Sequence, residues 1–285
     1  MMTAPAVAID LALPGGRVRA HRRGPRGGTP VVCIPGLSAN ALSFDLIAER
    51  LAADGRDVLA LDLRGRGHSP DSGRGSYGWP SHARDVLAAG AHAGAADGPV
   101  DLVGHSMGAF VAMQAAATQP RLVRRIVLID AAGPPEPSSL VAIGRAVARL
   151  GARHPSVEAY IARVREIGSI RPWHDLWERY LRYELAASGA GVRPRTSAPA
   201  VGEDLEYGSR HDPRALWPRL RGPALLVRAA EPIAPGEGFI VSADDAGAFA
   251  RQVPCARVVE VPANHYGVMT SPEAIEAVAA FLAEP

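Results

Sequence analysis

The chain has 285 residues, of which 47% are hydrophobic and 21% charged, and its 31 basic and 29 acidic residues give a net charge of +2. Every basic residue is an arginine, which excludes chemistry that needs a lysine side chain, such as a Schiff base or a phosphate-loop lysine. The absence of a long basic run argues against nucleic acid as a partner. Two cysteines, Cys33 and Cys255, are too few for a disulfide framework or a four-cysteine zinc site.

Hydropathy predicts where the protein resides. Residues 1–14 lack the positively charged start and the long apolar stretch of a secretory signal. No window of 18 or more apolar residues is present to span a bilayer. We therefore expect a soluble, cytoplasmic monomer or homodimer that binds a small molecule and no membrane.

In the first half of the chain, short apolar runs alternate with helical patterns, which is typical of a parallel sheet covered by helices. The predicted strands of this half are residues 7–13, 18–21, 31–34, 58–63, 100–103 and 126–129, and its predicted helices are 42–53, 80–93 and 107–118. The same alternation returns with strands at 224–228 and 257–261 and a helix at 272–283. The fold class is therefore α/β.

Between these two parts the strand–helix alternation stops. Residues 138–188 have helical patterns, and residues 189–209 have a loop-like composition. We predict one core domain, formed by residues 1–135 and 210–285, with a helical cap inserted at 136–209 after the sixth strand.

The sequence Gly-His-Ser-Met-Gly at 104–108 lies between a predicted strand and a predicted helix. A serine at a sharp strand-to-helix turn has an exposed hydroxyl, and the helix N-terminus beneath it favours a developing negative charge. Ser106 is therefore the candidate nucleophile. The alternative role for Ser106 is an ordinary helix N-cap in a glycine-rich turn.

Two further stretches agree with a nucleophilic serine. The turn Pro-Gly-Leu-Ser after the strand at 31–34 would bring the N–H of Leu37 towards Ser106, where it and the N–H of Met107 would form an oxyanion hole. His265 directly follows the last predicted strand, at the sheet edge where a general base could reach the serine.

With these stretches, and with Asp62 to Ser69 as a glycine–arginine loop, the chain resembles the α/β-hydrolase superfamily. The similarity is to its small esterases, lactonases and perhydrolases, which need no cofactor or metal. It implies a mostly parallel sheet, a helical cap over the site, and a catalytic triad in the order serine, acid, histidine.

The resemblance leaves the acid of the triad open. The usual acid follows the strand corresponding to 224–228, which makes Glu231 the first choice, although the glycine expected in that turn is missing. Asp130 is the main alternative, because some similar lipases have their acid after the strand at 126–129. Asp244 and Asp245 are the third choice.

Aromatic residues in the predicted cap suggest a pocket. Trp173, Trp177 and Tyr180 share one helical face, which would dock the cap or line an apolar pocket over Ser106, together with Tyr266. The lack of a charged cluster in this segment favours an uncharged, fairly hydrophobic ester or lactone.

Other activities of the same fold remain open. A serine nucleophile is also compatible with hydrolysis of an amide or a carbon–carbon bond, with perhydrolysis, and with a tailoring enzyme that acts on a bulky natural product. A receptor-like protein that binds its ligand with little turnover is the alternative from another functional class.

Overall fold

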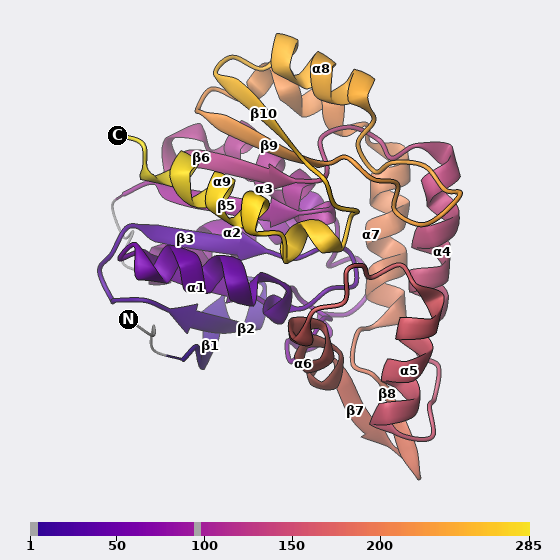
Figure 1. Cartoon of the computed structure of the whole chain (residues 1–285). Coiled ribbons are helices and arrows are strands. Elements are labelled where there is room, and N and C mark those ends of the chain that lie inside the picture. The colour runs from indigo at the N-terminus through magenta and orange to yellow at the C-terminus, as the bar shows by residue number, and fades with distance from the viewer. Residues whose placement is uncertain (1–4, 94–97) are drawn as a thin grey trace.

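The computed structural model describes residues 5–93 and 98–285. At its centre is an eight-stranded sheet with the strand order β1-β2-β4-β3-β5-β6-β9-β10 (Figure 1). The strands are β1 (Val7–Leu13), β2 (Gly16–Arg23), β3 (Pro30–Ile34), β4 (Asp57–Leu61), β5 (Val100–His105), β6 (Val123–Ile129), β9 (Ala224–Ala229) and β10 (Ala256–Val261). Strand β2 pairs antiparallel with β1 and with β4, whereas β4, β3, β5, β6, β9 and β10 are parallel, which confirms the predicted sheet.

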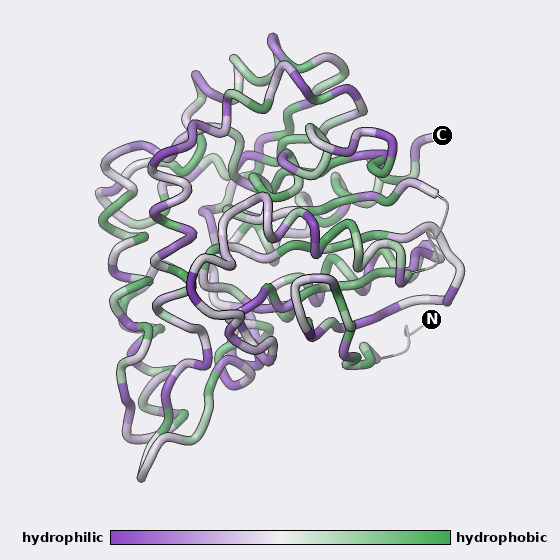
Figure 2. The backbone as a smooth tube through the Cα atoms, turned by 180° about the vertical axis from the view of Figure 1, so that it is seen from behind, coloured by the Kyte–Doolittle hydropathy of each residue, from purple (hydrophilic) through white to green (hydrophobic). Residues whose placement is uncertain are grey.

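Helices cover both faces of the sheet. One face carries α1 (Asp45–Ala53) and α9 (Pro272–Ala283), and the other carries α2 (Trp79–His92), α3 (Met107–Thr118) and α8 (Ala243–Gln252). In β3, Val31 and Cys33 pack on the first face while Val32 and Ile34 pack on the second. Because both faces are buried, the central strands are mostly apolar, and hydrophobic colour is prominent in the middle of the molecule in Figure 2.

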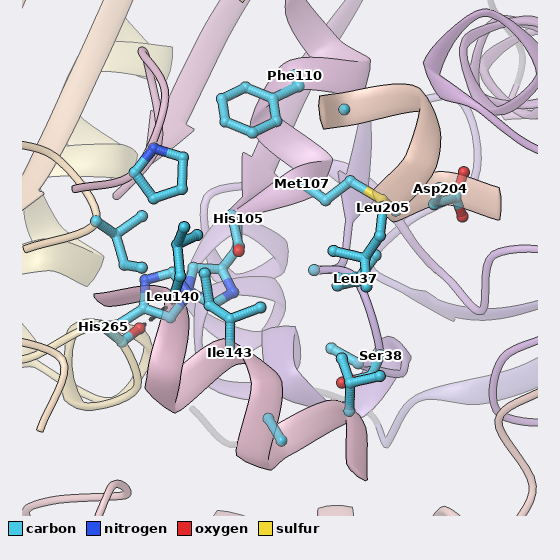
Figure 3. A pocket seen from close by; sticks show the side chains of 18 of the residues that line it. Leu37, Ser38, His105, Met107, Phe110, Leu140, Ile143, Asp204, Leu205 and His265 are labelled. Carbon is cyan, nitrogen blue, oxygen red and sulfur yellow. Dashed lines mark hydrogen bonds between the residues drawn. The ribbon is translucent and has the colours of Figure 1, made fainter. Parts of the chain in front are cut away.

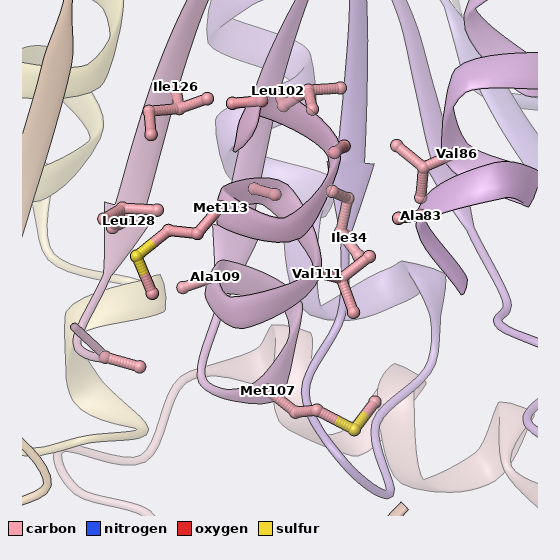
Figure 4. Packing of buried hydrophobic residues seen from close by; sticks show 14 of the residues in the cluster. Ile34, Ala83, Val86, Leu102, Met107, Ala109, Val111, Met113, Ile126 and Leu128 are labelled. Atoms are coloured by element: carbon pink, nitrogen blue, oxygen red, sulfur yellow. The ribbon is translucent and has the colours of Figure 1, made fainter. Parts of the chain in front are cut away.

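Helix α3 is the most deeply buried of these helices. Figure 4 shows Met113 of α3 beside Leu128 of β6, with Leu102 of β5 above them in this view and Val86 of α2 on the opposite side of α3. All four side chains are buried. The N-terminus of α3, which carries the predicted nucleophile, is thus fixed against the sheet.

The segment between β6 and β9 lies together at the carboxyl ends of the parallel strands (Figure 1). It contains α4 (Leu140–Ala148), α5 (Val157–Ile167), α6 (Asp175–Tyr183), β7 (Leu185–Ser188), β8 (Gly191–Pro194) and α7 (Ala198–Arg210). Short 3-10 helices occur along the chain as η1 (Ala41–Phe44), η2 (Pro120–Leu122), η3 (Pro137–Ser139), η4 (Pro213–Arg219) and η5 (Gly267–Met269).

Residues 189–209 are not the loop that their composition suggests. Strands β7 and β8 form a hairpin whose turn has Gly189 at a positive φ of 61°. Ser197 then caps α7, because its side chain accepts a hydrogen bond from the N–H of Ala200. Glycine and proline therefore mark a hairpin turn and a helix start here.

Within the described residues, none of the helices combines the length and the apolar character needed to cross a bilayer.

Candidate active site

Ser106 occupies the turn between β5 and α3 with φ of 54° and ψ of −127°. A positive φ is rare for a residue with a side chain and is kept only where the surroundings enforce it. Here the N–H of Ser106 donates to the carbonyl of Ile129 at the end of β6, at 3.0 Å. This turn lifts the serine side chain to the edge of the sheet.

The glycines around the serine are required by close backbone contacts. A Cβ on Gly108 would lie 2.0 Å from the carbonyl oxygen of Ile34, and one on Gly104 would lie 2.2 Å from that of Gly108. A Cβ on Gly36 would lie 3.1 Å from the Cβ of Ser106. The turn at 35–38 therefore packs directly against the candidate nucleophile.

His265 forms its hydrogen bond with Asp130. The Nδ1 atom of His265 lies 2.8 Å from Oδ2 of Asp130, and both side chains are buried. Asp130 follows β6 with φ of 48°, and its other oxygen accepts the N–H of Ala229 at 3.0 Å. The two oxygens of this carboxylate thus bind two different groups, the His265 ring and the backbone at the end of β9.

The first choice for the acid, Glu231, does not reach the histidine. Its backbone N–H donates to the carbonyl of Ala263, and its side chain is exposed. Asp244 and Asp245 lie in the first turn of α8, where Asp245 faces Arg214 at 3.5 Å. The structure therefore replaces Glu231 with Asp130 as the partner of His265.

The loop that carries His265 is held by its neighbour Asn264, which is fully buried. The side-chain amide of Asn264 donates to the carbonyls of Ser169 and Ile233, at 2.6 and 3.1 Å, and its oxygen accepts the N–H of Gly267 at 2.8 Å. These three bonds fix the loop before and after the histidine, so the imidazole has a defined position.

His105, the residue before the candidate nucleophile, contacts the loop that carries His265. Its Nε2 donates to the carbonyl of His265 at 2.9 Å, and the two rings are in tilted contact, with centroids 4.5 Å apart and an interplanar angle of 32°. Burial, together with the nearby His265, lowers the pKa of His105 well below its usual value, so this ring is neutral.

The turn that contains Leu37 is held from the core side. The fully buried Arg66 donates from Nε to the carbonyl of Leu37 at 3.0 Å and forms an ion pair with Asp204 of α7. His82 of α2 also bonds Asp204, at 3.0 Å. A buried arginine therefore fixes the carbonyl of Leu37. Met107 is the first residue of α3, so its N–H has no acceptor inside the helix.

A cavity of about 630 Å³ lies over these residues, a size suited to a small molecule. Ser106, His265, Leu37 and Met107 all line it. Figure 3 shows that Leu37 and Met107 come from the core, while Leu140 and Ile143 come from α4 and Leu205 from α7. The cavity is therefore a space between the sheet edge and the segment after β6, with mostly apolar walls.

Only part of the predicted aromatic pocket lines this cavity. Tyr180 and Tyr266 do so, as does His211 at the end of α7. Trp177 is instead buried in the packing between α6 and the core, where it contacts Tyr266 edge to face. Trp173 packs under the guanidinium of Arg165, 4.3 Å from the ring centroid. The two tryptophans are thus docking residues rather than pocket residues.

Two residues at this site, His105 and Arg149, were not predicted from the sequence. The side chains of a strand point alternately to its two faces, and nothing in the sequence shows that the ring of His105 contacts His265. Arg149 also lines the cavity, yet in the sequence it is one arginine among many on a helical pattern. Within the described ranges, no group of three or more histidine, cysteine or acidic side chains is placed to bind a metal ion.

Comparison with known proteins identifies the family to which this chain belongs. A family model described as alpha/beta hydrolase fold matches residues 29–272. A 2-(acetamidomethylene)succinate hydrolase from Mesorhizobium japonicum is 30% identical over 276 residues, which cover 90% of this chain and 89% of that protein. An N-formylmaleamate deformylase from Pseudomonas putida is 37% identical over 103 residues, which are 36% of this chain and 37% of that protein.

The solved structures agree. An E-2-(acetamidomethylene)succinate hydrolase superposes with a TM-score of 0.84 at 26% identity, over 98% of this chain and 100% of that one. A thioesterase domain from the curacin biosynthetic pathway superposes with a TM-score of 0.74 at 22% identity, over 98% of this chain and all of that one, a likeness of fold alone.

Proposed function

Because this chain belongs to the α/β hydrolase family, we propose that it is a serine hydrolase that cleaves a carboxylic ester or lactone through an acyl-enzyme on Ser106. The observation that carries the proposal is the hydrogen bond between the buried Asp130 and His265, beside a cavity that Ser106 also lines. A histidine oriented by a carboxylate next to a strained serine is the arrangement that activates a hydroxyl as a nucleophile.

In the first half of the reaction, the hydroxyl oxygen of Ser106 attacks the carbonyl carbon while Nε2 of His265 takes its proton. Asp130 keeps the proton of His265 on Nδ1, so that Nε2 is free to act as the base, and stabilises the imidazolium that forms. The N–H groups of Leu37 and Met107 stabilise the oxyanion, and each such donor contributes about 3 kcal/mol to the barrier reduction. The alcohol leaves with the proton from Nε2.

In the second half, His265 takes a proton from water, which attacks the acyl carbon. The collapse of this second intermediate returns the proton to Ser106 and releases the acid. The apolar walls formed by Leu140, Ile143 and Leu205 support a substrate with a hydrophobic part, because they bury apolar surface and exclude bulk water around the reacting bond.

An amide-type bond is the second candidate for the scissile linkage. The relative from Mesorhizobium japonicum, which covers most of this chain, is named for hydrolysis of an acetamido compound, and the relative from Pseudomonas putida is named for removal of a formyl group. The same nucleophile, base and oxyanion donors serve both bond types. Whether the enzyme cleaves an amide as well as an ester depends on how well His265 protonates the leaving nitrogen.

The proposal is tested by labelling with a fluorophosphonate probe, with the modified peptide located by mass spectrometry. We expect the label on Ser106, and we expect hydrolysis of p-nitrophenyl butyrate to fall at least a thousandfold in Ser106→Ala. Ser43, buried in η1, offers a matched control, because Ser43→Ala should keep the label and the activity.

Absence of both label and turnover in the folded wild-type protein would overturn the proposal. In that case a receptor-like role would be the better interpretation, and ligands that raise the melting temperature without being consumed would support it. A series of matched p-nitrophenyl esters and anilides then separates the two bond types, since a true amide hydrolase should cleave the anilide at a rate comparable with the ester.

A further inference from the structure

Arg149 lies at the C-terminal end of α4 and lines the same cavity as Ser106 and His265. Its Nε is sealed from solvent and has no hydrogen-bond partner. Among the described residues, its side chain forms no hydrogen bond and no ion pair within 4 Å. A guanidinium carries five donors, and a half-buried one that uses none of them on the protein is available for a ligand.

The other charged side chains that line the cavity already have partners. Asp204 is paired with Arg66 and His82, Arg210 with Glu206 at 2.6 Å, and Asp212 with Arg214 at 2.8 Å. Arg149 therefore differs from every other charged residue in the described lining. It introduces one unpaired positive charge into walls that are otherwise apolar or neutralised.

The nearby buried Glu184 attracts this charge but does not pair with it directly. Glu184 acts on Arg149 only at longer range, while one of its oxygens accepts from the hydroxyl of Tyr160 and the other has no hydrogen-bond partner. Burial raises the pKa of Glu184, which weakens it further as a counter-ion. Burial also raises the pKa of Tyr180 and Tyr266, so these phenols are neutral.

The charge on Arg149 itself is secure. Burial is the largest influence and lowers the pKa of this guanidinium, but Glu184 and the nearby tyrosines together raise the net pKa above its usual value. A guanidinium keeps its proton at every physiological pH. The cavity therefore holds a permanent cation whose carboxylate neighbour, Glu184, acts on it without a hydrogen bond or an ion pair within 4 Å.

We propose that Arg149 is a carboxylate-binding subsite, and that the substrate of this enzyme is an anionic ester or amide whose carboxylate pairs with this guanidinium while its acyl carbon lies at Ser106. The proposal rests on the proposed function and deepens it, because it names the charge of the substrate. It replaces the expectation of an uncharged substrate. Arginine matches a carboxylate with two parallel hydrogen bonds, so the subsite would also fix the orientation of the substrate.

The apolar walls then have a defined role. A substrate that spans the cavity has a charged end at Arg149 and an apolar middle against residues such as Leu140 and Ile143. In this low-dielectric space a charge-assisted hydrogen bond is stronger than in water. Binding energy at Arg149, remote from the reacting carbon, would hold the scissile carbonyl in place for attack.

The test uses substrate pairs that differ only in charge. One pair is monomethyl glutarate and its neutral carboxamide, with the carboxylate on the acyl side, and the other is 4-acetoxybutanoate and 4-acetoxybutanamide, with the carboxylate on the leaving group. In at least one pair we expect wild-type kcat/KM to favour the anion by about 10-fold to 100-fold, the range typical of a hydrogen-bonded charge. Arg149→Gln should lower this ratio at least tenfold, mainly through KM.

Two further variants serve as controls for Arg149→Gln. Arg145→Gln is the matched control, because Arg145 is on the same helix but pairs with Glu237 and does not line the cavity, so the ratio should not change. Arg149→Lys keeps the charge without the planar fork and should retain part of the preference, which also guards against a failure of Arg149→Gln to fold.

Binding to Ser106→Ala separates this proposal from the proposed function. Calorimetry with the same compounds should show tighter binding of the anion, and the double variant Ser106→Ala/Arg149→Gln should lose that difference. Equal binding and equal turnover of both members in both pairs would overturn the subsite, even if Ser106 is labelled. A preference for the anion that survives in Arg149→Gln would overturn it too. Selective binding of the anion without any label on Ser106 would support the subsite and contradict the hydrolase.

Discussion

Asp130 and His265 are 135 positions apart in the sequence, and the pair depends on two turns that present them to each other. Asp130 adopts a left-handed backbone conformation directly after β6, and Asn264 anchors the loop that holds His265. We expect Asp130→Asn to lower kcat by about 10³-fold to 10⁴-fold, because an amide would stabilise the wrong tautomer of the histidine.

Glu231→Gln is the comparison variant for Asp130→Asn. Its side chain is exposed, so the change should alter kcat by less than twofold. The measurement is kcat for the best ester at saturating concentration, with circular dichroism to show that both variants are folded. A large loss in Glu231→Gln together with an active Asp130→Asn would contradict the assignment of the acid.

His105 makes the stability of the protein depend on pH. Burial lowers its pKa well below 6.5 in the folded state, whereas in the unfolded chain the same ring has its ordinary pKa. Between these two values the unfolded chain binds the proton and the folded protein does not. The free energy of unfolding therefore decreases as the pH falls below about 6.5, by at most about 1.4 kcal/mol per pH unit for this one group.

Urea unfolding at pH 7.5, 6.5 and 5.5 measures this slope. The variant His105→Asn should show a smaller decrease between pH 6.5 and 5.5 than the wild type, although its absolute stability is lower because the carbonyl of His265 loses its donor. His92, which is exposed on α2, is the control, and His92→Asn should keep the wild-type slope. Identical slopes in all three proteins would show that His105 is not the group involved.

At the scale of elements, the strand-to-helix turn depends on the close approach of α3 to β3. A Cβ on Gly108 would lie 2.0 Å from the carbonyl oxygen of Ile34, so backbone must shift, and we expect Gly108→Ala to lower the free energy of unfolding by about 2 kcal/mol or more. Fluorophosphonate labelling of Ser106 should slow as well, since the same shift moves the turn at 35–38 away from the serine.

Gly144 in α4 is the opposite case. No atom lies within 4 Å of a Cβ built there, and the residue is inside a helix, so Gly144→Ala should stabilise the protein by about 0.5–1 kcal/mol. Urea unfolding of both variants gives the comparison. Equal effects of the two substitutions would mean that helix propensity, rather than the close contact, determines the result at position 108.

The core elements were predictable from the sequence because each carries its own local signal. The predicted strand at 7–13 and the predicted helix at 272–283 match β1 and α9 in full. The hairpin of β7 and β8 and the helix α7 escaped prediction, because glycine and proline in that stretch are also typical of loops. The end residues of the helices and strands also escaped exact prediction, because tertiary contacts determine where each element stops.

The part of the candidate site that lies in recognisable motifs was predictable from the sequence. Ser106 and His265 follow strands of a parallel sheet, whose carboxyl ends lie at one edge, so both could be named from the sequence. The choice between Asp130 and Glu231 could not be made, because it depends on which turn faces the histidine across β9. Arg149 and His105 have no local signal, since their roles arise from segments that meet only in the folded chain.

For the molecule as a whole, the buried pair of Arg66 and Asp204 connects the core with α7 of the segment that covers the site. Both side chains have no exposed surface, and Asp204 also accepts the N–H of Gly78 and bonds His82. A second tie runs from the N–H of Ser197 to the carbonyl of Gly65. Helix α7 is thus fixed to the core at the same place where Arg66 holds the turn of Leu37.

Removal of one partner leaves the other charge buried without compensation. We therefore expect Asp204→Ala to lower the free energy of unfolding by about 3–5 kcal/mol, whereas Glu166→Ala, which breaks an exposed pair with Arg163, should change it by no more than about 0.5 kcal/mol. Urea unfolding at neutral pH measures both. In the folded fraction of Asp204→Ala, kcat should fall more than KM rises, because Arg66 then no longer holds Leu37 in position for the oxyanion. A loss of less than 1 kcal/mol with unchanged kcat would show that the covering segment is held to the core by its apolar contacts instead.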